Sequence, residues 1–317
     1  MIQNFSQNIK SLFRPLLAIV ILYFLFKSGL LKLDQIKDII QKPGIIFWGL
    51  TLLSCQFLSF AIRWQIILKR SCPVPFAQVL KFQTIGQFFN LFIPGGIGGD
   101  FVKALEISKY NNISNKASIT SVLLDRVMGL YCMILFSLIF LFLERQKVSE
   151  NLLSISVVLF IVSTVGLFFS RKILSLFIRL THNYHNPFFV KLTDFLKTLD
   201  AGLSLLRDKK SLAYIIAVSF LAQCCSISFL FYCAQLITTE PISYLVFFPL
   251  ACFSFMASSI PITPGGIGFG QAAFYIIFKE ISPEVANAVV LGITLLQIYN
   301  ILISLPGAYF FTRISKR

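Results

Sequence analysis

Long apolar segments, separated by short polar ones, constrain the fold of this chain more than any other feature. Six such segments can be recognised, at roughly residues 12–31, 44–68, 117–143, 152–170, 211–238 and 285–311. A helix needs about 20 apolar residues to cross a ~30 Å hydrocarbon core, and only helices or closed barrels satisfy their backbone groups in lipid. The pattern predicts an all-α polytopic membrane protein with about six transmembrane helices. No small-residue cleavage site follows the first segment, so we expect a retained span.

Composition agrees with this class. Of the 317 residues, 56% are hydrophobic and only 13% are charged, about half of the quarter that is usual in soluble domains. The mean hydropathy is +0.81. These values exclude an ordinary cytosolic enzyme, a disordered chain and a coiled coil. The seven cysteines form no CxxC pair and there are only two histidines, so we expect neither a metal site nor a cofactor.

Two further apolar segments, 76–110 and 244–281, are interrupted in the middle by proline and glycine. The interruptions contain Pro94-Gly-Gly-Ile-Gly98 and Pro264-Gly-Gly-Ile-Gly268. Proline removes a helical donor and glycine lowers helix propensity. Each arm has about 10–18 residues, and at 1.5 Å per residue the shorter arms reach about half way through the core. We predict two re-entrant hairpins whose tips line a cavity or pack on protein.

The distribution of basic residues tests this topology. The chain has 28 Lys and Arg against 13 Asp and Glu, a net charge of +15. In a soluble protein this excess would suggest nucleic acid; here it is first a topology signal. If both hairpins return to the side they left, 19 of the 28 basic residues lie on the side of the N-terminus and 7 on the other. The bias favours cytoplasmic N- and C-termini in the plasma (inner) membrane.

The two broken segments align with each other at an offset of 170 residues, which carries Pro94 onto Pro264. The same offset carries 44–68 onto 214–238 and 117–143 onto 287–313. Each unit has an odd number of crossings, so the second copy must be inverted, as in alternating-access transporters. We expect one membrane domain, 1–317, with repeats at about 10–145 and 150–313. The alternative is a chance match between two common Pro-Gly-Gly turns.

The second unit contains a polar insertion at about 171–210. Within it, residues 187–207 have an apolar stripe at helical spacing. Basic residues flank this segment, so we expect an amphipathic helix on the anionic cytoplasmic leaflet. Anchoring is the expected role, with regulation as the alternative.

Charged residues within the spans are costly and are the first candidates for function. Asp125 and Arg126 lie near the middle of 117–143. One reading is an anion-binding Arg126 with Asp125 as its counter-ion or as a proton carrier. The other is a buried ion pair that fixes helix packing. Arg63 lies six residues before Lys69, so it is expected to snorkel to the interface, with headgroup contact as the alternative.

Polar residues also flank the two hairpin tips. Asp100 is expected to cap the returning half-helix, with Lys103 in reach at i, i+3. The equivalent half-helix begins near Gly270-Gln271 without an acidic cap, so its amides could hold a lipid phosphate. The glycines could allow headgroup approach or only tight packing. The candidate headgroup-binding residues are Arg63, Asn90, Gly95, Gly96, Asp100, Lys103, Asp125, Arg126, Gly265, Gly266 and Gln271. Further polar candidates are Gln87 near the first tip and Gln297 and Asn300 in the last span.

Three motifs together resemble the lysylphosphatidylglycerol synthase transmembrane family, whose members are flippase-like integral membrane proteins. They are Asn90-(x3)-Pro94-Gly-Gly-(x2)-Gly99-Asp100-(x2)-Lys103, Asp125-Arg126-(x2)-Gly129 and Pro261-(x2)-Pro264-Gly-Gly-Ile-Gly268. The resemblance covers about residues 10–313. In the full-length synthase, this module is taken to flip an aminoacylated phospholipid that a separate soluble domain makes. We expect no such soluble domain in this sequence. The resemblance therefore implies a stand-alone transporter-like module, not the synthase.

The chain departs from the family pattern at two positions. Lys103 stands where arginine is usual, which loses bidentate phosphate geometry. Gln271 stands where glutamate is usual, which weakens any proton coupling at the second hairpin.

The leading hypothesis is a flippase for a phospholipid or a lipid-linked glycan. The alternatives are a transporter of a small anionic solute and a non-catalytic partner of a lipid-modifying or glycosyltransferase complex. We expect no enzyme activity, because no HExxH or Gly-x-Ser-x-Gly motif is present. The expected partners are membrane lipids and not nucleic acid, with a homo-oligomer or a lipid-synthesising enzyme as a further possibility.

Overall fold

The computed structural model describes residues 41–69, 72–92, 98–146, 150–182, 187–203, 208–260, 262–263 and 266–314. Every regular element in these ranges is a helix. Five stretches of helix are long and apolar enough to cross a membrane. They are α3 (Pro43–Leu68), α6 (Asn115–Leu143), the first part of α7 (Glu150–His182), α9 (Lys209–Ile237), and α12 (Pro283–Ser304) together with α13 (Pro306–Ile314). This confirms an all-α polytopic membrane protein; the expected span at 12–31 lies outside the described residues.

Shorter helices occupy the two broken segments. The first segment forms α4 (Phe76–Phe92) and α5 (Gly98–Asn111), which pack against each other; the second forms α10 (Tyr244–Ser258) and α11 (Phe269–Phe278), which also pack together. The four helices have 17, 14, 15 and 10 residues, fewer than the ~20 that a full crossing needs. The expected tip residues 93–97, 261 and 264–265 lie outside the described residues.

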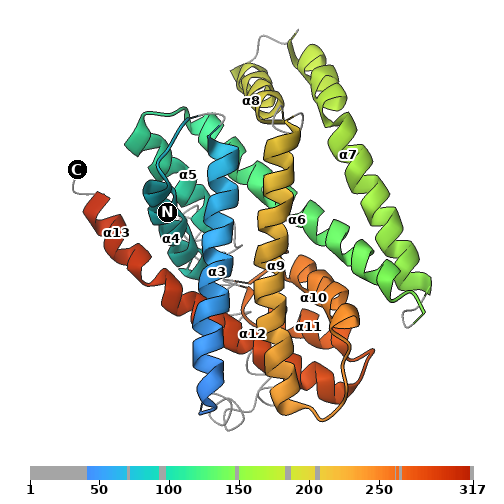
Figure 1. Ribbon diagram of the computed structural model, residues 1–317. Helices are drawn as coiled ribbons and strands as arrows, with labels where there is room; N and C mark the ends of the chain where they lie inside the picture. The colour runs from blue at the N-terminus through green and yellow to red at the C-terminus, as the bar shows by residue number, and fades with distance from the viewer. Residues whose placement is uncertain are drawn as a thin grey trace, which may run out of the picture.

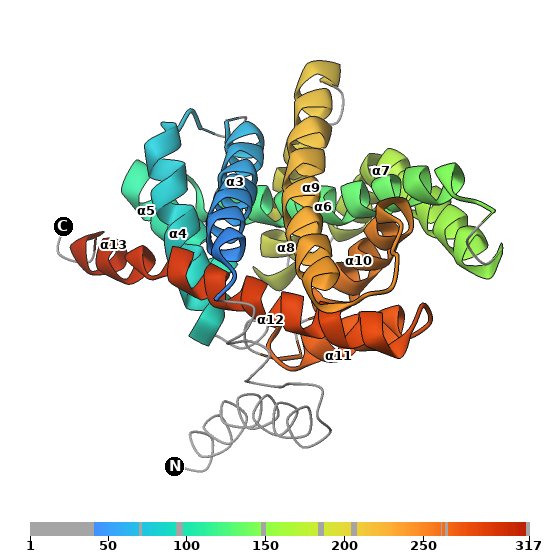
Figure 2. The same cartoon turned by 60° about the horizontal axis from the view of Figure 1, so that its bottom comes forward.

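The long helices hold the two helix pairs in place (Figure 1). Helices α3 and α9 lie side by side through the middle of the molecule. Helix α6 packs against α10, while α12 and α13 pack against α4. Each helix pair therefore contacts a long helix from the other half of the chain. Figure 2 shows α12 and α13 running across one side of the bundle, from α11 to α4.

Glycine permits the closest contact within the first helix pair. A Cβ atom placed on Gly99 would lie 1.9 Å from the carbonyl oxygen of Gly86. Real Cβ atoms do not approach backbone so closely, so α4 and α5 meet at a distance that only glycine allows at this position. Small residues that let helix backbones approach are the usual packing device in membranes, where helix–helix association depends on van der Waals contact.

The last predicted span, 285–311, is confirmed as one candidate crossing, Pro283–Arg313, with an irregular turn at Leu305. Helix α12 ends at Ser304 and α13 begins at Pro306. Proline has no backbone N–H and clashes with the preceding turn, which accounts for the irregular turn. Beyond it α13 packs on α4, where a Cβ on Gly307 would lie 2.4 Å from the carbonyl oxygen of Thr84.

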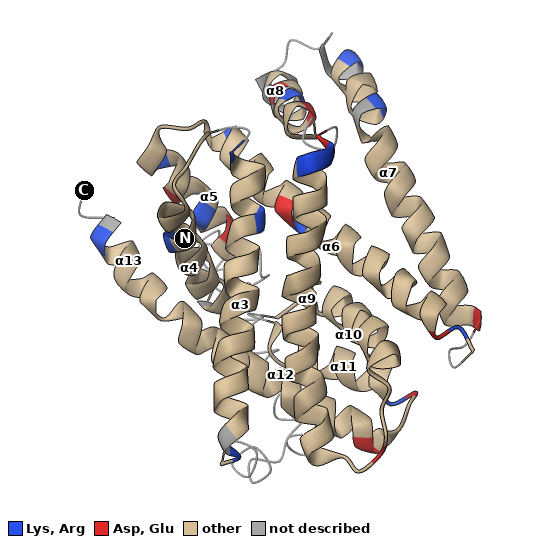
Figure 3. Cartoon of the chain, in the orientation of Figure 1, with Lys and Arg blue, Asp and Glu red and all other residues tan. Residues whose placement is uncertain are grey.

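Helices α7 and α8 (Pro187–Leu203) lie at the edge of the bundle. Helix α7 continues to His182, well past its apolar part, and α8 covers most of the predicted amphipathic helix. Helix α8 packs on α6 and α7, with Leu203 buried in a cluster that includes Leu124. Part of its apolar stripe therefore faces protein. Figure 3 shows basic residues gathered at the end of the molecule that carries α8.

Candidate functional site

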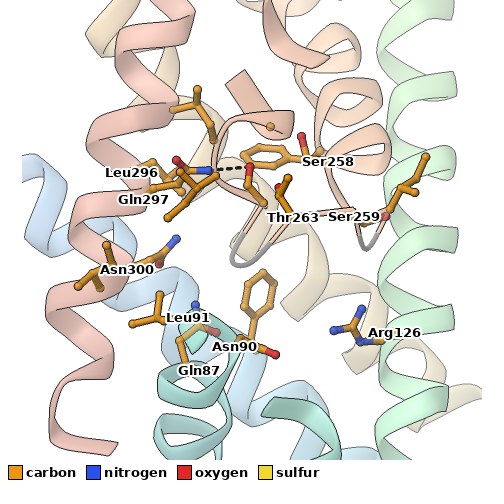
Figure 4. A pocket seen from close by; sticks show the side chains of 18 residues that line it. Gln87, Asn90, Leu91, Arg126, Ser258, Ser259, Thr263, Leu296, Gln297 and Asn300 are labelled. Carbon is orange, nitrogen blue, oxygen red and sulfur yellow. Dashed lines mark hydrogen bonds between the residues drawn. The ribbon is translucent and has the colours of Figure 1, made fainter. Parts of the chain in front are cut away.

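A cavity of about 360 Å³ lies where the two helix pairs meet α12. Helix α4 contributes Gln87 and Asn90, and α12 contributes Gln297 and Asn300. The end of α10, together with Thr263, Gly266, Ile267 and Gly270, forms the opposite wall. In Figure 4 the labelled side chains from both halves of the chain surround this space, with Arg126 of α6 at one side. Segments flanking both glycine motifs thus border one cavity.

The cavity wall is mostly neutral. Its apolar part includes Phe60, Leu91 and Leu296. Among the described residues that line it, Arg126 is the one charged side chain. The other polar side chains are amides and hydroxyls, from Gln87, Asn90, Ser258, Ser259, Thr263, Gln297 and Asn300. Such groups act as hydrogen-bond donors and acceptors without adding charge.

Arg126 lies beside a carboxylate that it shares with a lysine. Its Nε donates to Asp100 Oδ2, and Asp100 Oδ1 lies 3.1 Å from Lys103 Nζ. Lys103 Nζ also donates to Gln83 Oε1 at 2.9 Å and lies 4.5 Å from the ring centroid of Trp64. The Lys103 side chain is only 3% exposed, whereas that of Arg126 is 33% exposed. The arginine is therefore the accessible cation of this group.

Asp125 faces away from Arg126 and pairs with Arg63. Arg63 Nε donates to Asp125 Oδ1 at 2.7 Å and Nη2 donates to Oδ2 at 3.2 Å, while Nη1 donates to Ser219 Oγ at 3.3 Å. A Cβ on Gly129 would lie 3.1 Å from both Nη atoms, so this glycine leaves room for the guanidinium. The snorkelling expected of Arg63 is wrong, because its side chain is buried in this pair.

The counter-ion prediction for Arg126 is also corrected. Neighbouring residues on a helix point about 100° apart, so Asp125 reaches α3 while Arg126 reaches Asp100 of α5. Phe60 lines the cavity, and the centroid of its ring lies 5.2 Å from Arg63 Cζ. The Arg63–Asp125 pair therefore lies behind the cavity wall.

The charged groups of this region are paired with one another. In the described part of the chain, three cations, Arg63, Lys103 and Arg126, pair with two carboxylates, Asp100 and Asp125. Burying a charge in a low-dielectric environment is costly unless it is paired. The accessible Arg126 guanidinium makes the cavity suited to an anionic ligand.

Asn90 performs the capping role that was expected of Asp100. Helix α5 begins at Gly98, so Asp100 is already in its first turn. The Asn90 side chain comes from α4, and its Oδ1 accepts the backbone N–H of Gly99 at 2.9 Å. An amide oxygen in this position satisfies a helix-terminal donor. The Asp100 carboxylate is thus left to pair with the two cations.

Gln271 organises the second helix pair. Its Oε1 accepts the backbone N–H of Gly268 at 2.7 Å, and its Nε2 donates to Gln297 Oε1 at 2.6 Å. Gln297 Nε2 in turn donates to the carbonyl oxygen of Gly266 at 3.3 Å. Gly266 and Gly268 have φ values of 70° and 83°, a region where glycine is strongly favoured. Gln271 is 1% exposed and lies behind the cavity wall.

The predicted site residues therefore divide into four groups. Asn90, Arg126 and Gly266 line the cavity. Asp100 pairs with Arg126 and is itself paired with Lys103 behind the cavity wall. Arg63, Asp125 and Gln271 are buried in supporting contacts. The sequence-predicted residues outside the described part of the chain are Gly95, Gly96 and Gly265.

Sequence analysis missed several residues of the cavity wall. Ser258 and Ser259 stand just before Pro261, and Thr263 stands just before Pro264. Their positions next to the second glycine motif could have identified them as candidates. Ser219, which accepts a hydrogen bond from Arg63, had no such signal because it lies on a different helix, 156 residues away.

Comparison with known proteins identifies the family. Residues 11–307 match the family described as the lysylphosphatidylglycerol synthase TM region. A search of curated proteins gave no match to the chain.

Proposed function

The chain belongs to the lysylphosphatidylglycerol synthase transmembrane family, and on that premise we propose that it moves a phospholipid or a lipid-linked glycan between leaflets. The family and the apolar helices make it a lipid-related integral membrane protein. The observation that carries the proposal is the cavity itself. It lies between two broken apolar segments, and among the described residues of its wall the charged side chain is that of Arg126, which is 33% exposed.

Two repeats of opposite orientation would explain how such a cavity opens to alternate sides. The offset of 170 residues relates α3 to α9, the pair α4 and α5 to α10 and α11, and α6 to α12 with α13. The same correspondence holds for the packing. Helix α6 packs on α10 of the second repeat, and its counterparts α12 and α13 pack on α4 of the first. The four short helices support re-entrant hairpins, since each is shorter than a crossing.

In this mechanism the headgroup enters the cavity while the acyl chains stay in lipid. Arg126 binds the phosphate, a contact strengthened by opposite charge. Asp100 competes with the phosphate for Arg126, so binding is reversible. The Arg63–Asp125 pair joins α3 to α6 and thereby fixes the helix that carries Arg126. A headgroup site near the midplane would shield the phosphate from hydrocarbon during its crossing.

The protein is proposed to lie in the plasma (inner) membrane with both termini in the cytoplasm. The excess of basic residues on the side of the termini favours this orientation. The proposed partners are membrane lipids, with a second copy of the chain or a lipid-synthesising enzyme as an associated protein.

The test measures movement of NBD-labelled phosphatidylglycerol in liposomes containing the purified chain, with dithionite bleaching the outer leaflet only. We expect the wild-type protein to expose inner-leaflet lipid to dithionite. Arg126→Gln should slow this movement at least about tenfold, the effect of losing a charge-assisted contact. The control is Arg145→Gln, which removes the same charge at an exposed position after α6.

Two results would contradict the proposal. The first is equal movement by the wild-type protein and Arg126→Gln. The second is transport of a soluble anion, such as inorganic phosphate, without any lipid movement, which would instead favour the solute transporter.

A further inference from the structure

We infer that a groove between α6, α7 and α8 binds one acyl chain of a membrane phospholipid. The groove has a volume of about 400 Å³, within the range of small-molecule sites. Its wall shares no residue with the cavity beside Arg126. The groove is therefore a second binding site, and the inference does not depend on the proposed movement of lipid between leaflets.

The groove faces lipid because two of its walls belong to candidate membrane spans. Helix α6 and the first part of α7 are both long and apolar enough to cross a membrane. Only 6% of the most apolar stretch of α7 is buried inside the protein, against 39–56% for the other candidate spans. Leu123, Val127 and Leu130 of α6 line the groove and are exposed. In a membrane these side chains contact hydrocarbon and not water.

The groove is deeper than an ordinary lipid-facing helix surface. Figure 1 shows α6 and α7 diverging from the end at which the chain joins them. Helix α8 contacts both of them and adds Leu199 and Leu203 to the wall. Gly166 of α7 leaves a hollow, since nothing lies within 4 Å of a Cβ atom built on it. Association in lipid depends on van der Waals contact, so a ligand that fills a three-walled hollow is held better than one on a flat surface.

The chemistry of the wall selects an apolar ligand. None of the described residues that line the groove is charged. The hydroxyls of Ser163 and Ser170 donate to carbonyl oxygens in the preceding turn of α7, at 3.0 and 2.6 Å, and the Tyr131 hydroxyl lies 3.4 Å from that of Thr164. These polar groups are already hydrogen-bonded within the protein. A hydrocarbon chain fits such a wall, whereas a polar headgroup would be desolvated without gaining a hydrogen bond.

The length of the groove matches one acyl chain. Its wall on α6 runs from Leu123 to Ile134, which at 1.5 Å per residue is about 16 Å, or half of the ~30 Å hydrocarbon core. The wall on α7 runs from Ser163 to Leu174, the same span of sequence. Each leaflet fills half of the core with its acyl chains, so the groove is as long as the chains of a single leaflet are deep.

The experiment counts the lipids that the full chain retains after transfer from phosphatidylglycerol nanodiscs into detergent, by native mass spectrometry. Gly166→Phe places an aromatic ring in the hollow and should remove one retained phospholipid, lowering its occupancy at least about fivefold, because the chain is held by packing alone. Val165→Phe is the matched control, since Val165 is exposed on the same helix and does not line the groove. This control should retain lipid like the wild-type protein.

A second variant fills the groove from its other wall. Val127→Phe on α6 should also remove one retained phospholipid, and it keeps the test decisive if Gly166→Phe gives no folded protein. Phosphatidylcholine with the same acyl chains should be retained to within about threefold of phosphatidylglycerol, because the groove offers no charge to a headgroup.

Three results would overturn the inference. The first is an unchanged lipid count in the folded groove variants. The second is a free fatty acid, instead of a phospholipid, as the retained molecule. The third is a wild-type dimer that Gly166→Phe converts to a monomer, since the groove would then seat a second copy of the chain. Loss of the lipid in the groove variants, together with no movement of lipid between leaflets by the wild-type protein, would support the inference and overturn the flippase proposal.

Discussion

Arg63 and Asp125 form a two-point ion pair between α3 and α6, with N–O distances of 2.7 and 3.2 Å. Both side chains are less than a tenth exposed. The pair lies behind Phe60 at the cavity wall, so it supports the helix that carries Arg126 without lining the cavity itself.

Asp125→Asn should destabilise the folded protein strongly. The amide removes the negative charge and leaves Arg63 buried without compensation, which costs about 3–5 kcal/mol. Replacing both residues by leucine should recover much of the lost stability, because an apolar pair carries no desolvation penalty. Thermal unfolding of the purified protein in detergent measures both effects.

An exposed ion pair provides the control for this prediction. Lys116 and Asp194 lie 3.1 Å apart, with side chains 43% and 52% exposed. Removing Asp194 should cost at most about 1 kcal/mol. Equal effects of Asp125→Asn and Asp194→Asn would show that the buried pair has no special structural role.

Gly99→Ala should disrupt the first helix pair. The added methyl group would lie 1.9 Å from the Gly86 carbonyl oxygen, so α4 and α5 would have to move apart. We expect a large loss of folded protein, measured as the monodisperse fraction after size-exclusion chromatography. Gly166→Ala on α7 is the matched control, because nothing lies within 4 Å of its added methyl group. A normal yield of Gly99→Ala would contradict the close contact.

Asn90 variants should separate stability from ligand binding. Asn90→Ala removes the acceptor for the Gly99 N–H and should destabilise the protein by about 1 kcal/mol. Asn90→Asp keeps an acceptor and should retain most of that stability. It also adds a negative charge to the cavity wall, so it should weaken phosphatidylglycerol binding. Unfolding and lipid-binding curves for the two variants test this; tighter lipid binding by Asn90→Asp would contradict an anion site.

The helices of this protein could be predicted from sequence because each long apolar segment must form its own backbone hydrogen bonds in lipid. The glycine motifs likewise predicted where the apolar segments break. The irregular turn at Leu305 between α12 and α13 was not predicted, because the apolar count of 285–311 is continuous and Pro306 was given no weight.

The ion pairs could not be predicted because they depend on packing between distant helices. Arg63 and Asp125 are 62 residues apart, and Asp100 and Arg126 are 26 apart. The sequence identified Asp125 and Arg126 as costly charges but could not assign their partners. Only the i, i+3 contact between Asp100 and Lys103 was expected, since it lies within one helix, and it is confirmed.

An electron cryo-microscopy structure in phosphatidylglycerol nanodiscs would show directly whether Arg126 and the surrounding cavity hold a lipid phosphate. We expect phosphate density within hydrogen-bond distance of the Arg126 guanidinium. Density for the headgroup only at the outer surface of the helices, with the cavity holding no lipid, would contradict it.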